Sequence, residues 1–121
     1  KGPEVTMVKE EGSTSTFDAK TMTATIENTN GKTIKLHVVS ESRSDGAETP
    51  TITTGSTAEV AADASWLTVS ENVTGAEGDY TLTLGAAQTL PASTTVTFTS
   101  TASTVATTVK VVLKAAPAPA P

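Results

Sequence analysis

Short runs in which apolar and polar residues alternate dominate this chain of 121 residues. The segment Tyr80–Leu84 is typical, because Tyr80, Leu82 and Leu84 alternate with two threonines. Successive side chains of a β-strand point to opposite faces, so such a run has one face for a core and one for water. Threonine and valine are branched at the β-carbon and favour the same extended structure. No segment sustains a helical period, so the sequence predicts an all-β protein.

The alternating runs predict seven or eight short antiparallel strands at spacings of about 8–12 residues, which is typical of an immunoglobulin-like sandwich. The polar stretch 71–79 contains two glycines and predicts a turn region. We expect strands at Val5–Lys9, Met22–Glu27, Thr33–Val39, Ser65–Ser70, Tyr80–Leu84, Thr94–Ser100 and Val105–Leu113, with weaker candidates at Thr51–Thr54 and Ala58–Ala62.

Aromatic residues are scarce, and Trp66 is the only tryptophan beside one tyrosine and two phenylalanines. We expect this indole to fill the space between two sheets, because one buried aromatic side chain covers roughly 150–250 Å². The other expected core residues are apolar positions of the alternating runs. The predicted core is Trp66, Leu67, Val69, Ile26, Ile34, Leu36, Leu82, Val96, Phe98, Val109 and Val111.

Two hairpins are predicted, the first around Asn30-Gly31. A three-residue loop, 29–31, would place Ile26 opposite Ile34, so that both apolar rows share a face, with Gly31 in the left-handed region. The same register places Ala24 opposite Leu36.

The second predicted hairpin joins the last two runs through a two-residue turn at Ala102-Ser103. It would place Val96 opposite Val109, Phe98 opposite Thr107 and Thr94 opposite Val111.

Length and charge set the domain organisation and exclude some partners. We expect residues 1–114 to form a single immunoglobulin-like domain, and the Ala-Pro repeats of residues 115–121 to be a tail or linker in polyproline geometry. The chain begins Lys1-Gly2-Pro3, so we expect a processed product or a fragment. The formal net charge of −5 disfavours nucleic acid as a partner. No apolar run reaches the ~20 residues that span a bilayer, so we expect no membrane insertion.

Few residues offer chemistry. His37 is the only histidine and there is no cysteine, so the usual zinc sets and catalytic triads lack partners. Calcium ligands at Asp45-Gly46 or within 71–79 lack the spacing of known calcium loops, and the scattered carboxylates are expected to be solvated. Asn72-Val73-Thr74 fits the N-glycan acceptor pattern. We therefore expect no enzyme, no cofactor and no metal, with sugar stacking on Trp66 or Tyr80 left as an alternative role.

From about residue 57 to 114, the order of elements resembles the BACON domain of Bacteroidetes and their phages. The resemblance rests on Trp66-Leu67-Thr68-Val69-Ser70, a following glycine turn, the Tyr80–Leu84 strand, and a threonine-rich final hairpin. The chain departs from that pattern where the family usually has an arginine, at 92–94, and at Lys114 in place of a glutamine. A more distant bacterial or phage immunoglobulin-like domain is the alternative.

This resemblance implies a noncatalytic module in an extracellular setting, on a bacterial surface protein or a bacteriophage virion. There we expect it to act as a spacer, a capsid decoration or fibre part, or a weak adhesin. Its partners would be capsid protein, neighbouring domains or a glycan. The alternative expectation is a carbohydrate- or mucin-binding accessory module of a secreted glycan-processing protein.

Overall fold

The computed structural model describes residues 2–42, 51–52, 56–100 and 103–118. These residues form strands and their connections, with no helix among them, so the prediction of an all-β protein is confirmed. There are more strands than the seven or eight predicted, because three of them have only two or three residues. In chain order they are β1 (Glu4–Val8), β2 (Thr16–Asp18), β3 (Thr23–Glu27), β4 (Thr33–Val39), β5 (Glu41–Ser42), β6 (Thr51–Ile52), β7 (Ser56–Val60), β8 (Leu67–Thr74), β9 (Glu77–Leu84), β10 (Ser93–Ser100) and β11 (Ser103–Lys114).

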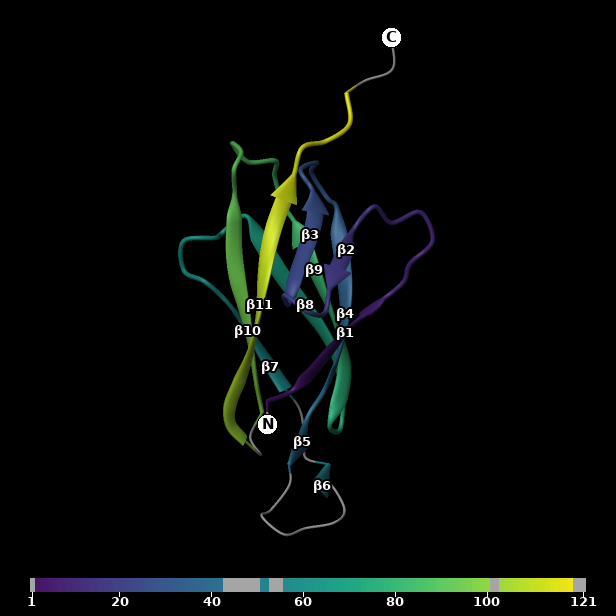
Figure 1. The fold of residues 1–121 in the computed structure, drawn as a ribbon, viewed down its shortest axis with the longest axis vertical. Helices are drawn as coiled ribbons and strands as arrows, with labels where there is room; N and C mark the ends of the chain where they lie inside the picture. The colour runs from purple at the N-terminus through teal and green to yellow at the C-terminus, as the bar shows by residue number, and fades with distance from the viewer. Residues whose placement is uncertain (1, 43–50, 53–55, 101–102, 119–121) are drawn as a thin grey trace.

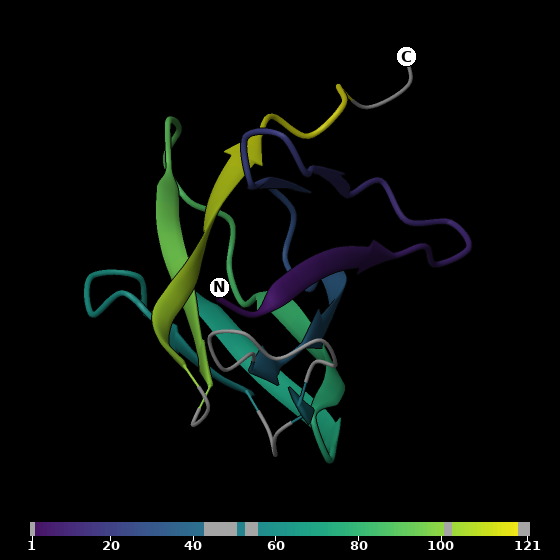
Figure 2. The same ribbon diagram turned by 60° about the horizontal axis from the view of Figure 1, so that its bottom comes forward.

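Most of the strands form two facing sheets in a sandwich-like arrangement (Figure 1). The first sheet has the order β1-β4-β9-β8 and is antiparallel throughout. The second has the order β2-β3-β11-β10-β7, and its β3–β11 pair is parallel. The strands β5 and β6 form a separate pair. The loop between β1 and β2 projects to one side of the sandwich in both ribbon views (Figure 1, Figure 2).

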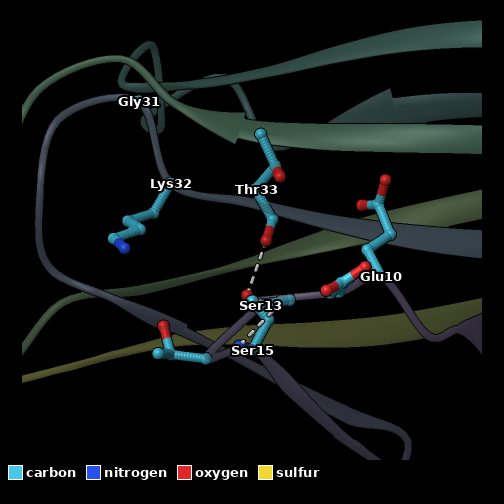
Figure 3. Close-up of a pocket in the computed structure, with 9 residues that line it drawn as sticks. Glu10, Ser13, Ser15, Gly31, Lys32 and Thr33 are labelled. Atoms are coloured by element: carbon cyan, nitrogen blue, oxygen red, sulfur yellow. Dashed lines mark hydrogen bonds between the residues drawn. The ribbon is translucent and has the colours of Figure 1, made fainter.

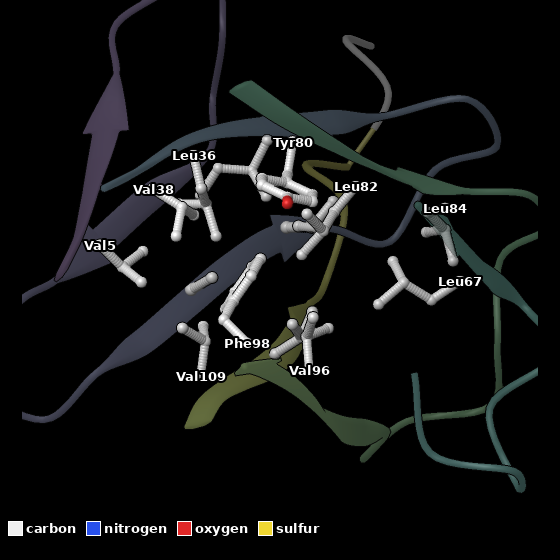
Figure 4. Close-up of a cluster of buried hydrophobic side chains, with 14 of the residues drawn as sticks. Val5, Leu36, Val38, Leu67, Tyr80, Leu82, Leu84, Val96, Phe98 and Val109 are labelled. Carbon is white, nitrogen blue, oxygen red and sulfur yellow. The ribbon is translucent and has the colours of Figure 1, made fainter. Parts of the chain in front are cut away.

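Alternation decides which side chains fill the space between the sheets (Figure 4). On β9, Tyr80, Leu82 and Leu84 are fully buried, while the threonines between them lie half-buried on the outer face. Phe98 of β10 faces them from the second sheet and is also fully buried. The rings of Tyr80 and Phe98 meet edge to face, with centroids 5.1 Å apart and an interplanar angle of 74°. This aromatic pair, drawn from both sheets, forms the centre of the core.

Trp66 does not fill that space, contrary to the prediction. It lies in the turn before β8 and is half-buried, packed against the core. The reason is that Leu67 is the first residue of β8 and takes the inward position opposite Leu84, which leaves the indole beyond the end of the strand. Val69 is half-buried as well. The remaining predicted core residues are buried: Leu67, Ile26, Ile34, Leu36, Leu82, Val96, Phe98, Val109 and Val111.

The first predicted hairpin is wrong, because β3 and β4 belong to different sheets. Ile26 lies opposite Leu113 of β11, and Ile34 lies opposite Leu82 of β9, so the two isoleucines are not cross-strand neighbours. The turn between them bonds to the end of β9 instead: the Gly31 N–H donates to the Leu84 carbonyl at 2.7 Å. Gly31 does adopt the expected left-handed conformation, with φ of 84°.

The stretch 71–79, predicted as a turn region, forms the adjoining ends of β8 and β9. Only Gly75 and Ala76 lie in the turn, and Gly75 is left-handed with φ of 64°. Gly78 is a strand residue opposite Val73. A Cβ at Gly78 would lie 2.6 Å from the Val73 Cα, so this glycine permits a close approach of the two strands.

The register of the last hairpin is confirmed. Thr94 lies opposite Val111, Val96 opposite Val109, and Phe98 opposite Thr107. Beyond Phe98 the register shifts, and Ser103 pairs with Ser100 as a strand residue, which corrects its predicted place in the turn. Ala102, the other predicted turn residue, lies outside the described residues.

Candidate functional site

A polar hollow lies between the β1–β2 loop and the start of β4 (Figure 3). Its volume is about 260 Å³. The loop side contributes two carboxylates and several hydroxyls, and the β3–β4 turn contributes one lysine. The lining residues are Glu10, Glu11, Gly12, Ser13, Thr14, Ser15, Gly31, Lys32 and Thr33. Such a lining can hydrogen-bond a hydroxylated ligand, but none of these residues is aromatic, so it offers no stacking surface for a sugar ring.

Hydrogen bonds fix the loop against β4. The buried Ser15 hydroxyl donates to the Thr33 carbonyl at 2.6 Å, and the Ser15 N–H donates to the Ser13 hydroxyl at 3.2 Å. Lys35 on β4 forms an ion pair with Glu10, 3.4 Å from its carboxylate. Gly12 supplies the left-handed residue that the loop requires, with φ of 78°. The hollow therefore has a fixed shape set by local contacts.

A buried carboxylate lies beside the hollow at the end of β3. The side chain of Glu27 is 8% exposed and pairs with the Lys32 ammonium at 3.2 Å. The Thr14 hydroxyl donates to the same carboxylate at 3.2 Å, while the Lys114 ammonium donates to the Thr14 carbonyl at 3.0 Å. These bonds join the loop, the β3–β4 turn and the end of β11. Since the Lys32 ammonium is already paired with Glu27, we assign its charge a structural role.

His37 lies on the outer face of β4, as its alternation with Leu36 and Val38 predicts, but it has partners that the sequence did not suggest. Its Nδ1 lies 2.8 Å from an Asp79 carboxylate oxygen on β9, and its Nε2 lies 3.5 Å from a Glu77 carboxylate oxygen. The hydrogen bond to Asp79 raises the pKa of His37 above 6.5, desolvation opposes that rise, and the charges of Asp79 and Glu77 add to it.

This histidine–aspartate pair has the spacing of a catalytic dyad, but the other ring nitrogen faces a carboxylate. A general base that activates a hydroxyl needs that nitrogen next to the nucleophile. Glu77 takes this place, so the cluster is suited to holding a proton on His37. Asp79 precedes the inward Tyr80 and is therefore outward by alternation. Only the pairing of β4 with β9, 42 positions apart at these residues, brings the two side chains together.

The aromatic residues considered for sugar stacking are placed differently. Tyr80 is 0% exposed and its hydroxyl bonds to Ser56, so it is not available to a ligand. Trp66 is half-buried and packs against the core, and its carbonyl accepts a hydrogen bond from the Gly85 N–H at 2.8 Å.

The calcium candidates are not supported as loops. Asp45-Gly46 lies outside the described residues, and 71–79 consists of two paired strands around a short turn. Within the described part of the chain, no group of three or more His, Cys, Asp or Glu side chains is arranged to hold a metal ion. Asn72, the first residue of the stretch that fits the N-glycan acceptor pattern, is exposed on β8. In the described part of the chain, no helix has the length and hydrophobicity needed to cross a membrane.

Comparison with protein-family models, with curated proteins and with solved structures found no match to this chain.

Proposed function

We propose that this chain is a noncatalytic structural module of the immunoglobulin type, serving as a spacer or decoration. The strand order supports this. Naming β1, β4, β7, β8, β9, β10 and β11 as strands A to G gives the order A-B-E-D for the first sheet and G-F-C within the second. This is the strand order of an immunoglobulin constant-type sandwich. In these terms β3 is a second A strand, placed parallel to G, and β2 is an addition at the sheet edge.

The observation that supports the spacer role is that the chain enters and leaves the sandwich at different ends. The Thr107 hydroxyl on β11 donates to the Pro3 carbonyl at 2.5 Å, which places the start of the described chain beside the first half of β11. The exposed tail 115–118 leaves from the far end of the same strand (Figure 1). Flanking segments of a longer polypeptide would therefore leave from opposite ends, as they do in modules that act as spacers.

The resemblance to BACON domains supports a setting on a bacterial surface or a phage particle. In that setting, neighbouring domains or capsid protein are the partners we propose. The outer faces agree with this role, because residues such as Thr81, Thr83, Thr95 and Thr97 make them hydroxyl-rich.

A tandem polypeptide tests the proposal. Copies joined through residues 115–121 should lengthen in small-angle X-ray scattering by about 24 Å per module, from the part of β11 between Thr107, where the chain enters, and Lys114, at about 3.4 Å per residue. The linker, if extended, adds about 20 Å. A compact, folded-back tandem contradicts the spacer role.

A glycan array on the same protein addresses the alternative of a carbohydrate-binding module. The hollow beside Glu10 is the feature that favours this alternative. The spacer role predicts no saturable binding. Saturable binding that is lost in Glu10→Gln and kept in Glu4→Gln, a control on the exposed outer face of β1, would replace the spacer role with glycan recognition.

A further inference from the structure

The strand β8 lies at the edge of the first sheet and pairs on one side only, with β9. It is eight residues long, and within the described part of the chain no strand pairs with its other side. Its outward backbone N–H and C=O groups are therefore open to a further strand, except that the Leu67 N–H donates to the Ala64 carbonyl at 3.2 Å. Lysine and proline commonly protect such an edge, and β8 contains neither.

Glu71 is the one charged residue of β8, and it lies on the inner face. Its Cα is opposite Tyr80, which is fully buried, and it shares that face with Val69 and Val73. The two valines are half-buried, whereas Glu71 is exposed at the open margin of the sandwich. Burial raises the pKa of the Tyr80 hydroxyl, the hydrogen bond to Ser56 lowers it, and the nearby charge of Glu71 raises it again. The effect of Glu71 on the pKa of Tyr80 agrees with a carboxylate on the inner side of the sheet.

We propose that the open edge of β8 is a pairing surface for the β8 strand of a second copy of this chain, and that the charge of Glu71 keeps it unoccupied. A strand added beside β8 would extend the sheet and cover the inner face next to Glu71. The carboxylate would then lose water without gaining a partner, which is costly. Inward-pointing charges protect edge strands in this way.

The sequence of β8 is self-complementary apart from this residue. Directly opposed residues of an antiparallel pair share a face, so two copies can pair only with inner residues opposite inner residues. In the register centred on Ser70, Leu67 meets Val73 of the second copy, and Thr68 meets Asn72. Apolar side chains then line the inner face, and polar ones line the outer face. This match is why a second copy is the occupant that we propose.

Glu71 opposes pairing in both of the longest registers that keep inner residues opposite inner residues. In the register centred on Ser70, its carboxylate faces Val69 of the second copy. In the register centred on Glu71 itself, the two carboxylates face each other, and like charges directly opposite destabilise a strand pair. No slip that preserves the faces removes the problem, since the neighbouring registers place Glu71 opposite Leu67 or Val73.

The test compares the oligomeric state of the wild-type chain with Glu71→Val and Glu59→Val, using sedimentation velocity across a wide concentration range. Glu59 is the matched control: it is exposed on the edge strand β7 and lies opposite Thr97, on the outer face. A strand added to β7 would leave its carboxylate in water. We expect wild type and Glu59→Val to sediment as monomers of 12.2 kDa, and Glu71→Val as a dimer of twice that mass. Hydrogen exchange of β8 amides should slow only in the dimer.

Three results of this comparison would overturn the proposal. They are a folded Glu71→Val that stays monomeric at the highest concentration, a wild-type dimer paired through β8, and a Glu59→Val that dimerises equally. Glu71→Thr, which is uncharged and suited to strands, replaces Glu71→Val under the same criteria if the valine variant does not fold. Glu71→Lys keeps a charge on the inner face and should remain monomeric, and its dimerisation would also overturn the proposal. None of these outcomes depends on the spacer role.

Discussion

The hydroxyl of Tyr80 connects the two sheets, and its removal in Tyr80→Phe gives the most direct test of the core. The Tyr80 hydroxyl donates to the Ser56 carbonyl, and the Ser56 hydroxyl lies 2.9 Å from the Tyr80 hydroxyl oxygen. Tyr80 is 0% exposed and Ser56 is 3% exposed, so water does not replace the lost bonds. The ring and its contact with Phe98 remain, so the variant isolates the polar contribution.

The expected cost follows from what Tyr80→Phe leaves behind. Removing one partner and leaving a buried polar group unsatisfied costs about 1–3 kcal/mol. Here both the carbonyl and the hydroxyl of Ser56 lose their bond to Tyr80. We expect the free energy of unfolding to fall by about 2 kcal/mol, within that range. For a chain of this size the melting temperature should fall by roughly 6–12 °C, at about 3–6 °C per kcal/mol.

Urea denaturation followed by circular dichroism measures this change, with Ser56→Ala as the matched variant. In Ser56→Ala the Tyr80 hydroxyl still donates to the backbone carbonyl, so the loss should be smaller than in Tyr80→Phe. The reasoning is refuted if Tyr80→Phe is as stable as wild type, or if Ser56→Ala costs more than Tyr80→Phe.

Three further predictions concern the strand interfaces and turns. Gly78→Ala should lower the free energy of unfolding by about 1–3 kcal/mol, because its Cβ would meet the β8 backbone. Gly85→Ala, with its nearest contact at 3.5 Å, should cost less when both variants are compared by urea denaturation. The His37 pKa is raised on folding, so the stability it adds is fully present below pH 6.5 and is lost as pH rises through the folded pKa. This half-exposed group should add under about 1 kcal/mol, and NMR titration should show its pKa falling in Asp79→Asn. Asn28→Ala removes two 2.8 Å bonds to the Gln88 backbone and should cost about 1–2 kcal/mol; equal loss in the exposed Asn30→Ala, which removes one bond to the Ala87 N–H, would contradict this.

The faces of the strands could be predicted from the sequence, but their partners could not. Alternation placed Ile26 and Ile34 inward, and both are buried. The same pattern fits two strands side by side in one sheet and two strands facing each other across a sandwich. The bonds that hold the β3–β4 turn come from elsewhere in the chain: the side chains of Asn28 and Asn30 bond to the backbone of Gln88 and Ala87 in a distant loop. Nothing in the local sequence specifies those bonds.

The final hairpin was predictable because a single register satisfies both of its apolar rows. Val96 and Phe98 must share a face with Val109, and a short connection leaves little freedom. The prediction for Trp66 failed for a different reason. A large aromatic residue at the start of a strand can pack against the core from the turn, and Tyr80 and Phe98 already occupy the centre.

The candidate sites depended on pairings that the sequence left open. The hollow forms where the β1–β2 loop meets the β3–β4 turn, and this contact follows from the placement of β3 and β4 in different sheets. His37 gains its carboxylate partners only through the pairing of β4 with β9. His37 was placed correctly on the outer face, but Glu27, one of the carboxylates expected to be solvated, is buried. The neighbours of both residues come from tertiary structure.

The parallel pairing of β3 with β11 has a consequence for biosynthesis. Ala24 lies opposite Val111, about 90 positions later in the chain, so β3 has no partner in that position until β11 has left the ribosome. Closing a loop of this length costs conformational entropy before any new contact offsets it, and this slows folding. We therefore expect the nascent chain to expose the inner faces of β3 and β10 until β11 has been synthesised, and the second sheet to form only after β11 has emerged.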